Sequence, residues 1–430
     1  MVLVFACAAI ATRLIAQSPA PTLRVTFDDA IKRAMEKNPT VQAAASAILR
    51  AEGLVRQARA ATRLQITGNV TTTTLNTGVE FQGATVTPQN QVTASLTAEM
   101  PIVAAAAWAR RAQAEDAKAV AELTVSDARR QIAFAAADAY LTILAQRRVV
   151  ESNGRARDTA KAHFDLASEL ERQGTGSRLN ALRAQQQWST DEALVEAARL
   201  ALYRAQEALG VLIAADEPAD AIDEPAFAVP ADEAQLFPKT PGLPMTPGPK
   251  GPGLRTDLKL FAGQQQAAEH VLRDSSKDWW PTVTALFQPS TTYPPQFFLP
   301  ANSWRFLLQA NVPIFGSGVQ SALKTQREAA VDQARATVAG ATLAANAQVR
   351  AAREAVASGE RGLVSARAAA DQAQQVLTIT TVSFRAGAAT NIEVIDASRS
   401  ARDAETAVAI AEDLLRRARF ELLNALGRFP

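Results

Sequence analysis

The stretch that decides the fold is Val92-Thr93-Ala94-Ser95-Leu96-Thr97-Ala98-Glu99-Met100-Pro101-Ile102, where apolar or small side chains alternate with polar ones as far as Met100. Such alternation is typical of a β-strand with one apolar face. After Pro101 the spacing becomes helical and Ala-rich for roughly 70 residues, on the order of 100 Å at 1.5 Å per residue. The stretch therefore marks a corner at which a strand leads into a very long helix.

The same corner occurs a second time, at Val312-Pro313-Ile314. Gly174 and Gly387 mark equivalent breaks between helices, and both copies end in Ala-Leu-Gly. These landmarks recur at offsets of 212, 213 and 217 residues. A repeat of this length indicates a duplicated half-protein, over residues 38–213 and 255–430, and not a solenoid.

Each copy contains two strand-like segments. They cover about residues 64–75 and 91–100 in the first copy and about 281–288 and 303–313 in the second. Segments of about ten residues with one apolar face are long enough to cross an outer membrane at a tilt. A soluble sheet on a core is the alternative, but the long helices leave no obvious partner layer. Aromatic residues cluster around the second pair: Trp279, Trp280, Tyr293, Phe297, Phe298, Trp304 and Phe315.

Two helical hairpins are expected, over residues 103–213 and 319–427, each turning at a short Gly-containing break. The first repeat then spans residues 18–215 and the second 255–430. Residues 216–254 between them are rich in Pro and are either a disordered linker or an irregular band around the helices. We favour a band for the first half, where Ile222, Phe227 and Val229 are available for packing.

Residues 1–17 are predicted to be a signal peptide, because Val2–Ala11 is an apolar run followed by small residues. The single Cys, Cys7, lies in that run, so the mature chain would offer neither disulfides nor thiol chemistry. No later segment approaches 18 consecutive apolar residues, which argues against a transmembrane helix. The formal net charge of +2 gives no electrostatic reason to expect a nucleic-acid partner.

Groups that would support catalysis are missing from the sequence. His163 and His270 have no metal-ligand spacing to another His or Cys and are interpreted as ordinary helix residues. Gly316-Ser317-Gly318 follows a strand but lacks the later Gly and Lys of a phosphate loop, and we interpret it as a tight corner. The sequence therefore predicts no enzyme, no cofactor and no metal site.

One acidic pair stands out after the second Gly break. Glu393 and Asp396 are three residues apart at the start of a helix and share one face. Favourable charge at a helix N-terminus is the simpler explanation. However, the first copy has Asn180 and Arg183 at these positions, so the hairpin itself does not require the acids.

Taken in order, four segments resemble the TolC-like outer-membrane efflux protein family, or outer membrane factors. They are Val25–Ile31 followed by Asn38-Pro39, then Arg255-Thr256-Asp257-Leu258 with Thr where Pro is usual, then Pro313–Gly318, and finally Phe384–Gly387. The likeness extends over nearly the whole mature chain.

The resemblance implies a mainly α protein with two tandem repeats that extends from the outer membrane into the periplasm. Long antiparallel hairpins would form a periplasmic α-barrel, and each protomer of a homotrimer would give four strands to a 12-stranded transmembrane β-barrel. The implied function is a passive channel of a tripartite efflux or type I secretion system. The implied partners are outer-membrane lipid, a periplasmic adaptor protein and, through the adaptor, an inner-membrane pump.

The resemblance also implies roles for particular residues. Glu393 and Asp396 would form an acidic, cation-selective pore constriction, and the adaptor would dock at the hairpin tips, at Gly174, Gly176 and Gly387. The family often latches its closed tip with an Arg two residues after the tip Gly and a Tyr three before it. Ala389 and Phe384 stand at those places here, which leaves Phe384 and Arg385 as the candidate gate latch.

Two other interpretations remain open from the sequence. A periplasmic adaptor also has long α-hairpins and β-structure, although it would need one hairpin flanked by β-rich halves. An exported coiled-coil protein without a pore would also fit the helices. Among channels, drug efflux, metal efflux and protein secretion are not separated by this chain alone.

Overall fold

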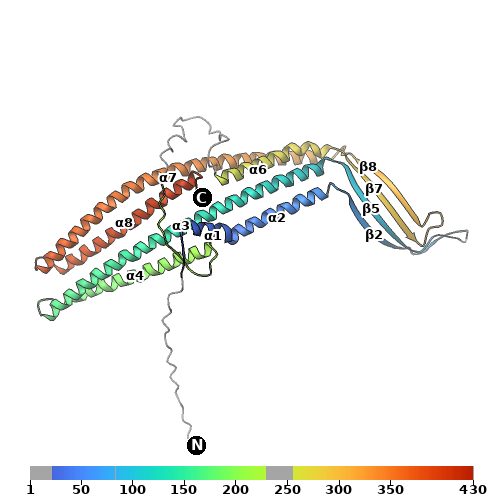
Figure 1. Ribbon diagram of the computed structural model, residues 1–430. Coiled ribbons are helices and arrows are strands. Elements are labelled where there is room, and N and C mark those ends of the chain that lie inside the picture. Colours follow the sequence, from blue (N-terminus) through green and yellow to red (C-terminus); the bar gives the residue numbers. More distant parts are fainter. Residues whose placement is uncertain (1–21, 83, 229–254, 430) are drawn as a thin grey trace, which may run out of the picture.

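The computed structural model describes residues 22–82, 84–228 and 255–429, so the expected signal peptide and Cys7 lie outside the described residues. The described chain is elongated, with a β-sheet at one end and the turns of two helical hairpins at the other (Figure 1). It is mainly helical and built from two tandem copies with a small β contribution, which is the expected fold class.

The two copies share one order of main elements: a helix, two long strands and two long helices. In the first copy these are α2 (Pro39–Ala60), β2 (Gln65–Thr74), β5 (Asn90–Ala104), α3 (Ala105–Arg172) and α4 (Arg178–Leu212). In the second they are α6 (Thr256–Arg273), the 3-10 helix η1 (Asp274–Trp279), β7 (Thr282–Tyr293), β8 (Asn302–Asn311), α7 (Val319–Arg385) and α8 (Asn391–Ala425).

Four short strands and one short helix complete the described chain. Strands β1 (Leu23–Val25) and β6 (Ala219–Ala221) pair in parallel, and β3 (Val79–Phe81) and β4 (Ala84–Thr87) form a small hairpin. Helix α1 (Phe27–Lys37) begins after Thr26, whose hydroxyl accepts a hydrogen bond from Asp29 N at 3.3 Å. It ends at Asn38, whose side chain accepts from Thr40 N at 2.9 Å and so starts α2.

The long strands form one antiparallel sheet in the order β2-β5-β7-β8. The sequence pattern ended the third strand near residue 288, because Pro289 follows, but β7 continues to Tyr293. Proline has no N–H to donate, and the pairing of β5 with β7 is interrupted between Ser95 and Ala98, opposite this residue. Pairing resumes beyond it, so Pro289 interrupts one ladder without ending the strand.

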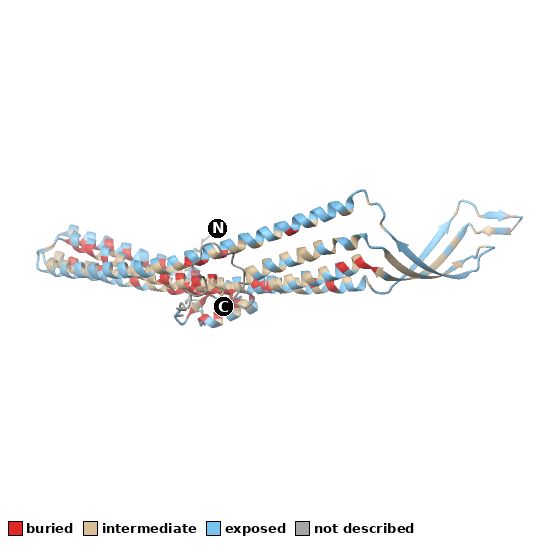
Figure 2. Cartoon of the chain, turned by 90° about the horizontal axis from the view of Figure 1, so that it is seen from above, coloured by how far each residue is buried: buried red, intermediate tan, exposed pale blue. Residues whose placement is uncertain are grey.

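Most of the buried residues lie midway along the molecule and in the hairpins, whereas the sheet is largely exposed (Figure 2). The core at this midpoint contains Tyr140 and Leu209 of the first copy and Phe420 of the second. The first part of the Pro-rich segment joins it, because Phe227 packs on Phe27 and Phe420. Ile222 is instead mostly exposed, and Val229 lies outside the described residues.

Candidate functional site

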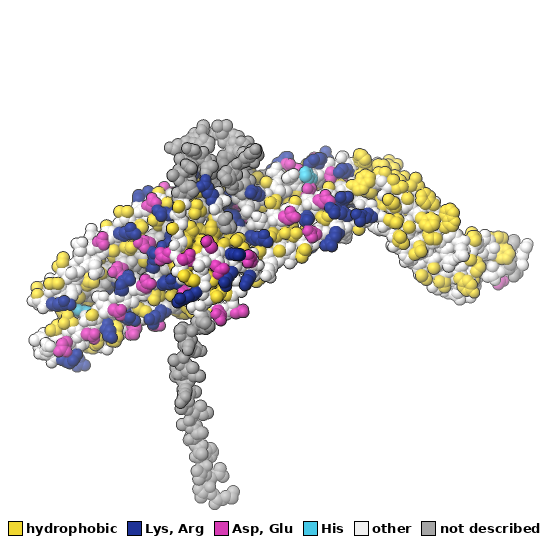
Figure 3. All heavy atoms as spheres, in the orientation of Figure 1, with side chains coloured by type: hydrophobic (Ala, Val, Ile, Leu, Met, Phe, Trp, Pro, Cys, Tyr) yellow, Lys and Arg dark blue, Asp and Glu magenta, His cyan; other side chains and the backbone are white. Residues whose placement is uncertain are grey.

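One face of the sheet is apolar and open to solvent in the single chain. Paired residues such as Val70 and Ala94, or Phe287 and Phe306, place their side chains on the same side of the sheet. Val70 is 70% exposed. The apolar side chains cover the sheet end of the molecule in the space-filling view, whereas charged side chains cover the helices (Figure 3). This face carries Ile66, Leu96, Ala98, Ala285, Trp304 and Leu308.

The opposite face of the sheet is polar. Arg305 Nε donates to Gln288 Oε1 at 2.6 Å, and Gln288 Nε2 donates to Thr97 Oγ1 at 3.3 Å. Both charged residues of the four strands, Glu99 and Arg305, belong to this face. Leu307, which breaks the alternation in the sequence, also lies here, opposite Leu286.

Both hairpins turn at glycines with left-handed backbone. Gly174 has φ 75° and Gly387 has φ 73°, a region that favours glycine. In the first turn, Leu170 O accepts from Thr175 N at 3.1 Å and from Gly176 N at 2.8 Å. The structure therefore places Gly174, Gly176 and Gly387 at the exposed ends of the two hairpins, the end of the molecule away from the sheet (Figure 1).

The acidic pair lies in the first turns of α8, next to the second hairpin turn. Glu393 forms a capping box with Thr390: its carboxylate accepts from Thr390 N at 2.7 Å, and its N–H donates to Thr390 Oγ1 at 3.4 Å. Asp396 is exposed one turn further on. The Glu393 carboxylate therefore caps the start of α8, whereas the Asp396 carboxylate is exposed to solvent.

A hydrogen-bonded bridge near the tips joins the two hairpins, and the sequence did not predict it. His163 Nε2 on α3 donates to Asn391 Oδ1 at 2.5 Å, and Asn391 Nδ2 donates to Asn180 O on α4 at 3.1 Å. Phe384, a candidate latch residue, packs edge-on against His163, with ring centroids 5.4 Å apart. Burial lowers the pKa of His163, and the hydrogen bond to Asn391 opposes that shift. Arg385 is exposed.

Between the His163–Asn391 bridge and the core at the midpoint of the molecule, α3 and α8 run antiparallel and are joined by ion pairs. Arg148 contacts Glu412 at 2.5 Å, and Arg417 contacts Asp138 at 2.7 Å. Arg402 of α8 also reaches the buried carboxylate of Asp191 on α4, at 2.6 Å. The seam between the hairpins is therefore polar along much of its length.

Neither a metal site nor a membrane-spanning helix emerges from the described part of the chain. Within it, no three His, Cys, Asp or Glu side chains are grouped so as to hold a metal ion. None of its helices combines the length and the apolar character that crossing a membrane requires.

Comparison with known proteins identifies the family. The family model for outer membrane efflux proteins matches residues 30–215 and 255–428, which together are most of the chain. The chain belongs to the outer membrane efflux protein family. This family consists of channels and not enzymes. No curated protein sequence matches the chain significantly.

Solved structures share the fold of this efflux protein at low sequence identity. The outer membrane protein VceC from Vibrio cholerae is 19% identical, with a TM-score of 0.76 over 93% of this chain and 96% of VceC. A membrane protein from Pseudomonas aeruginosa is 20% identical, with a TM-score of 0.75 over 94% and 91%. The CmeC outer membrane channel from Campylobacter jejuni is 12% identical, with a TM-score of 0.75 over 94% and 86%.

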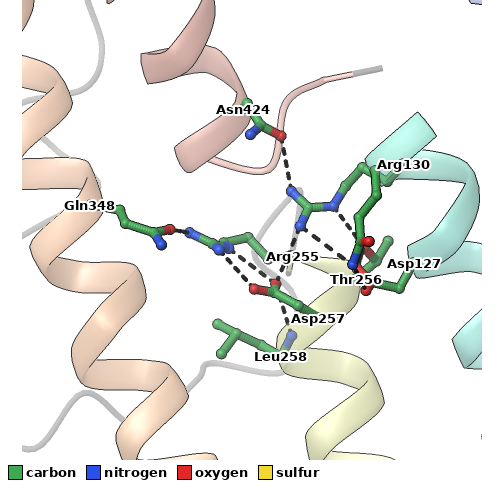
Figure 4. Close-up of polar contacts among 9 residues, drawn as sticks. Asp127, Arg130, Arg255, Thr256, Asp257, Leu258, Gln348 and Asn424 are labelled. Carbon is green, nitrogen blue, oxygen red and sulfur yellow. Dashed lines mark hydrogen bonds and ion pairs between the residues drawn. The ribbon is translucent and has the colours of Figure 1, made fainter. Parts of the chain in front are cut away.

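A second polar cluster links the first repeat of the chain to the second repeat (Figure 4). Thr256 donates to Asp127 Oδ1 at 2.7 Å and accepts from Arg130 Nε at 2.7 Å. Arg130 also donates to Asn424 Oδ1 at 3.0 Å. Burial acts to raise the pKa of Asp257, but Arg255 and Arg130 outweigh it and hold that pKa below its usual value. This joint links α3, α6 and α8.

Proposed function

We propose that this efflux protein is the outer-membrane channel of a tripartite efflux or type I secretion system, and that it works as a homotrimer. The observation that carries the proposal is the sheet. Among the described residues, no layer covers its apolar face, and its two outer strands, β2 and β8, each have an unpaired edge. In lipid, an apolar face is favourable but an unpaired strand edge is not. Four strands from each of three protomers would form a closed 12-stranded barrel, in which no strand edge remains unpaired.

The two faces of the sheet support an assignment of inside and outside. The apolar face, with Val70 and Phe306, would contact lipid. The polar face, with Glu99 and Arg305, would line a water-filled bore. An Arg or Lys side chain in contact with lipid costs about 2–4 kcal/mol at mid-membrane, and an acidic one costs less. The position of both charged residues on the other face therefore supports this assignment. The hairpins would then extend the bore into the periplasm.

The hairpin tips are the proposed docking place for a periplasmic adaptor, which would connect the channel to an inner-membrane pump. Gly174, Gly176 and Gly387 lie in exposed turns at the end farthest from the sheet, where a partner from the inner membrane would first arrive. Phe384 and Arg385 remain the proposed latch: Phe384 packs on His163 within the chain, and the exposed Arg385 would act between protomers. The family match favours this channel role over that of an adaptor.

Glu393 and Asp396 are proposed to form an acidic constriction, because the three protomers of a trimer would bring six carboxylates around one axis. Changing both residues, E393Q with D396N, should lower the permeability of cations relative to anions, measured as the reversal potential of single channels in a salt gradient. Gln at residue 393 still completes the capping box, so the helix start is preserved.

The matched control is E405Q, on the same helix, where the carboxylate is paired with Arg155 at 3.3 Å. It should leave the reversal potential unchanged. Unchanged selectivity in the double variant would remove both residues from the site. If the purified wild-type protein gives no conductance at all in lipid bilayers, the channel proposal itself is wrong.

A further inference from the structure

The parts of the helices that adjoin the sheet are strongly basic. They are the end of α2, the start of α3, helix η1 and the start of α7, together with the residues that link them to the strands. Within residues 56–63, 105–114, 274–280 and 314–327, eight Lys or Arg residues occur with only two acidic ones. The eight bases, which we call the basic rim, are Arg56, Arg59, Arg63, Arg110, Arg111, Lys277, Lys324 and Arg327, and the two acids are Asp274 and Asp278.

The balance of charge reverses in the next ten residues of the helices, away from the sheet. These are residues 46–55 of α2, 115–124 of α3, 264–273 of α6 and 328–337 of α7. Seven acids there outnumber four Lys or Arg residues. Positive charge is therefore concentrated in the turns nearest the sheet. The seven acids are Glu52, Glu115, Asp116, Glu122, Glu269, Glu328 and Asp332.

The opposite end of the sheet has no comparable set of bases. The connections from β2 to β5 and from β7 to β8, residues 75–89 and 294–301, contain neither Lys nor Arg, and Glu80 is their single charged residue. Solubility alone gives no reason for this asymmetry, whereas an anionic surface at one end of the sheet does.

Part of the basic rim is neutralised within the chain and part is not. Arg59 pairs with Glu115 at 3.0 Å. By contrast, Arg56, Arg63 and Arg110 are exposed and have no acidic partner among the described residues. Three guanidinium groups are thus available to bind an anion from outside the chain.

Tryptophan side chains accompany the basic rim. Trp108 near the start of α3 is 46% exposed, and Trp279 and Trp280, at the end of η1 and just after it, are 50% and 55% exposed. Trp is enriched where a protein meets lipid headgroups, because its ring is apolar and its N–H group is polar. In the space-filling view, Lys and Arg side chains lie directly beside the apolar side chains of the sheet (Figure 3). The rim therefore lies where the apolar surface gives way to the charged surface of the helices.

We propose that the basic rim binds the headgroups of anionic phospholipids in the leaflet nearest the helices, which is the periplasmic one. This inference rests on the proposed function, in which the sheet crosses the outer membrane. Guanidinium groups donate paired hydrogen bonds to phosphate oxygens, and a negative membrane surface attracts bases that lie next to it. This attraction fades within a Debye length, about 8 Å at physiological salt, so the bases nearest the sheet feel it more than the acids behind them. Zwitterionic lipids carry no net charge and are attracted less.

Fluorescence quenching by brominated lipids tests this proposal in the full chain reconstituted in bilayers. The chain has five Trp residues, of which Trp108, Trp279 and Trp280 lie at the rim. Changing the other two, W188F with W304F, leaves only the Trp residues at the rim and keeps an aromatic ring at each changed place. Quenching by brominated phosphatidylglycerol, compared with quenching by brominated phosphatidylcholine, gives the relative binding constant of the two lipids beside the rim.

The rim should favour phosphatidylglycerol about fivefold, which is the effect of one Lys or Arg residue beside an anionic surface. Raising the salt concentration from about 0.1 to about 1 M shortens the Debye length from about 10 to about 3 Å and should remove the preference. Neutralising the three unpaired bases, R56Q with R63Q and R110Q, should bring the ratio of the two binding constants close to one.

The matched control is R178Q with R183Q and R204Q. It removes the same charge from exposed places on α4, in the hairpin half of the molecule, and should keep the preference for phosphatidylglycerol. Equal loss of the preference in both triple variants would show that net charge acts from a distance, and would overturn a site at the rim.

The outcomes separate this inference from the function beneath it. Equal quenching by the two lipids, in a protein that conducts ions, would overturn the lipid site and leave the channel proposal intact. A preference that survives in R56Q with R63Q and R110Q would do the same. The salt test needs no arginine variant, and a preference unchanged at about 1 M salt would also overturn the site. A protein that conducts no ions and is quenched by neither lipid would overturn both proposals.

Discussion

The hydroxyl group of Tyr140 accepts hydrogen bonds from the backbone N–H groups of Ile222 and Asp223, each at 3.1 Å, and donates one to the Asp223 carboxylate. The same carboxylate accepts from Phe27 N at 2.9 Å, at the start of α1. One fully buried side chain of α3 thereby ties together α1 and the segment after β6. Burial and the bond to Asp223 both raise the pKa of Tyr140, so it stays neutral at physiological pH.

Removing this hydroxyl should destabilise the middle of the molecule. In Y140F two backbone donors and one carboxylate lose a buried partner, which costs about 1–3 kcal/mol. The thermal unfolding temperature in detergent should fall. Y203F, at a half-exposed tyrosine, should change the free energy of unfolding by less than about 0.5 kcal/mol. Equal shifts for the two variants would show that the Tyr140 hydroxyl contributes little.

The His163 bridge should respond to pH. Because burial lowers the pKa of His163 below its ordinary value of about 6.5, the folded contact favours the neutral ring. The contact therefore gives its full stabilisation above the ordinary His pKa of about 6.5. This stabilisation is lost as the pH falls below that pKa and through the lower pKa of His163 in the folded protein. Spin labels on T175C and A388C, in the two turns, should report a longer or broader tip-to-tip distance at acidic than at neutral pH.

H163Q keeps a donor for Asn391 and should abolish that pH response. H270Q is the control, since His270 bonds to Asp116 at 2.8 Å at a distant place on α3 and α6. A response that survives in H163Q would assign the pH dependence to another group.

At the scale of elements, the turn of each hairpin is set by local backbone requirements. Gly174 and Gly387 adopt the left-handed backbone conformation with which many helices end. Because this conformation favours glycine, the sequence alone was enough to locate both breaks. Gly176 is different. A Cβ there would lie 2.8 Å from the carbonyl carbon of Leu170, which is a close approach that only the folded turn reveals.

Two alanine substitutions should therefore act in opposite directions. G176A forces the backbone of the turn to shift, at a cost of about 1–3 kcal/mol. G154A lies inside α3 with open space around the new Cβ, and should stabilise the helix by about 0.5–1 kcal/mol. Unfolding temperatures of the two variants, measured side by side in detergent, give the comparison. A neutral G176A would mean that the turn relaxes without cost.

At the scale of the whole molecule, the sheet and the helices present different surfaces. Its apolar face is continuous across four strands from both halves of the chain, whereas charged side chains cover the helices (Figure 3). One end is thus suited to lipid and the rest to water. No single strand carries this distinction, because each one contributes only about five side chains to the apolar face.

Leu307 and Leu308 provide a matched test, since they are adjacent in β8 but lie on opposite faces. L308R places a charge among the proposed lipid contacts, at a cost of about 2–4 kcal/mol near mid-membrane. It should reduce the amount of folded protein in outer-membrane fractions. L307R faces the proposed bore and should assemble normally. Equal losses for both variants would contradict the assignment of the two faces.

Much of this architecture can be predicted from the sequence, because the signals are local. Period-two alternation gave the faces of the strands, Pro and Gly gave the corners and turns, and the duplication gave two equivalent halves. Contacts between distant residues were beyond reach. His163 appeared to be an ordinary helix residue, and Thr256 only a departure from the family's Pro.

The periodic pattern of apolar residues is thus sufficient to predict a duplicated, largely helical chain with one sheet that has an apolar and a polar face. The reason is that this periodicity follows from the geometry of each helix or strand by itself. Which elements meet is a different matter. Asn391 bonds to Asn180, 211 residues away in the chain, and Arg130 reaches Asn424. Such pairs depend on how the long helices are aligned side by side, and small polar side chains leave no periodic trace of that alignment in the sequence.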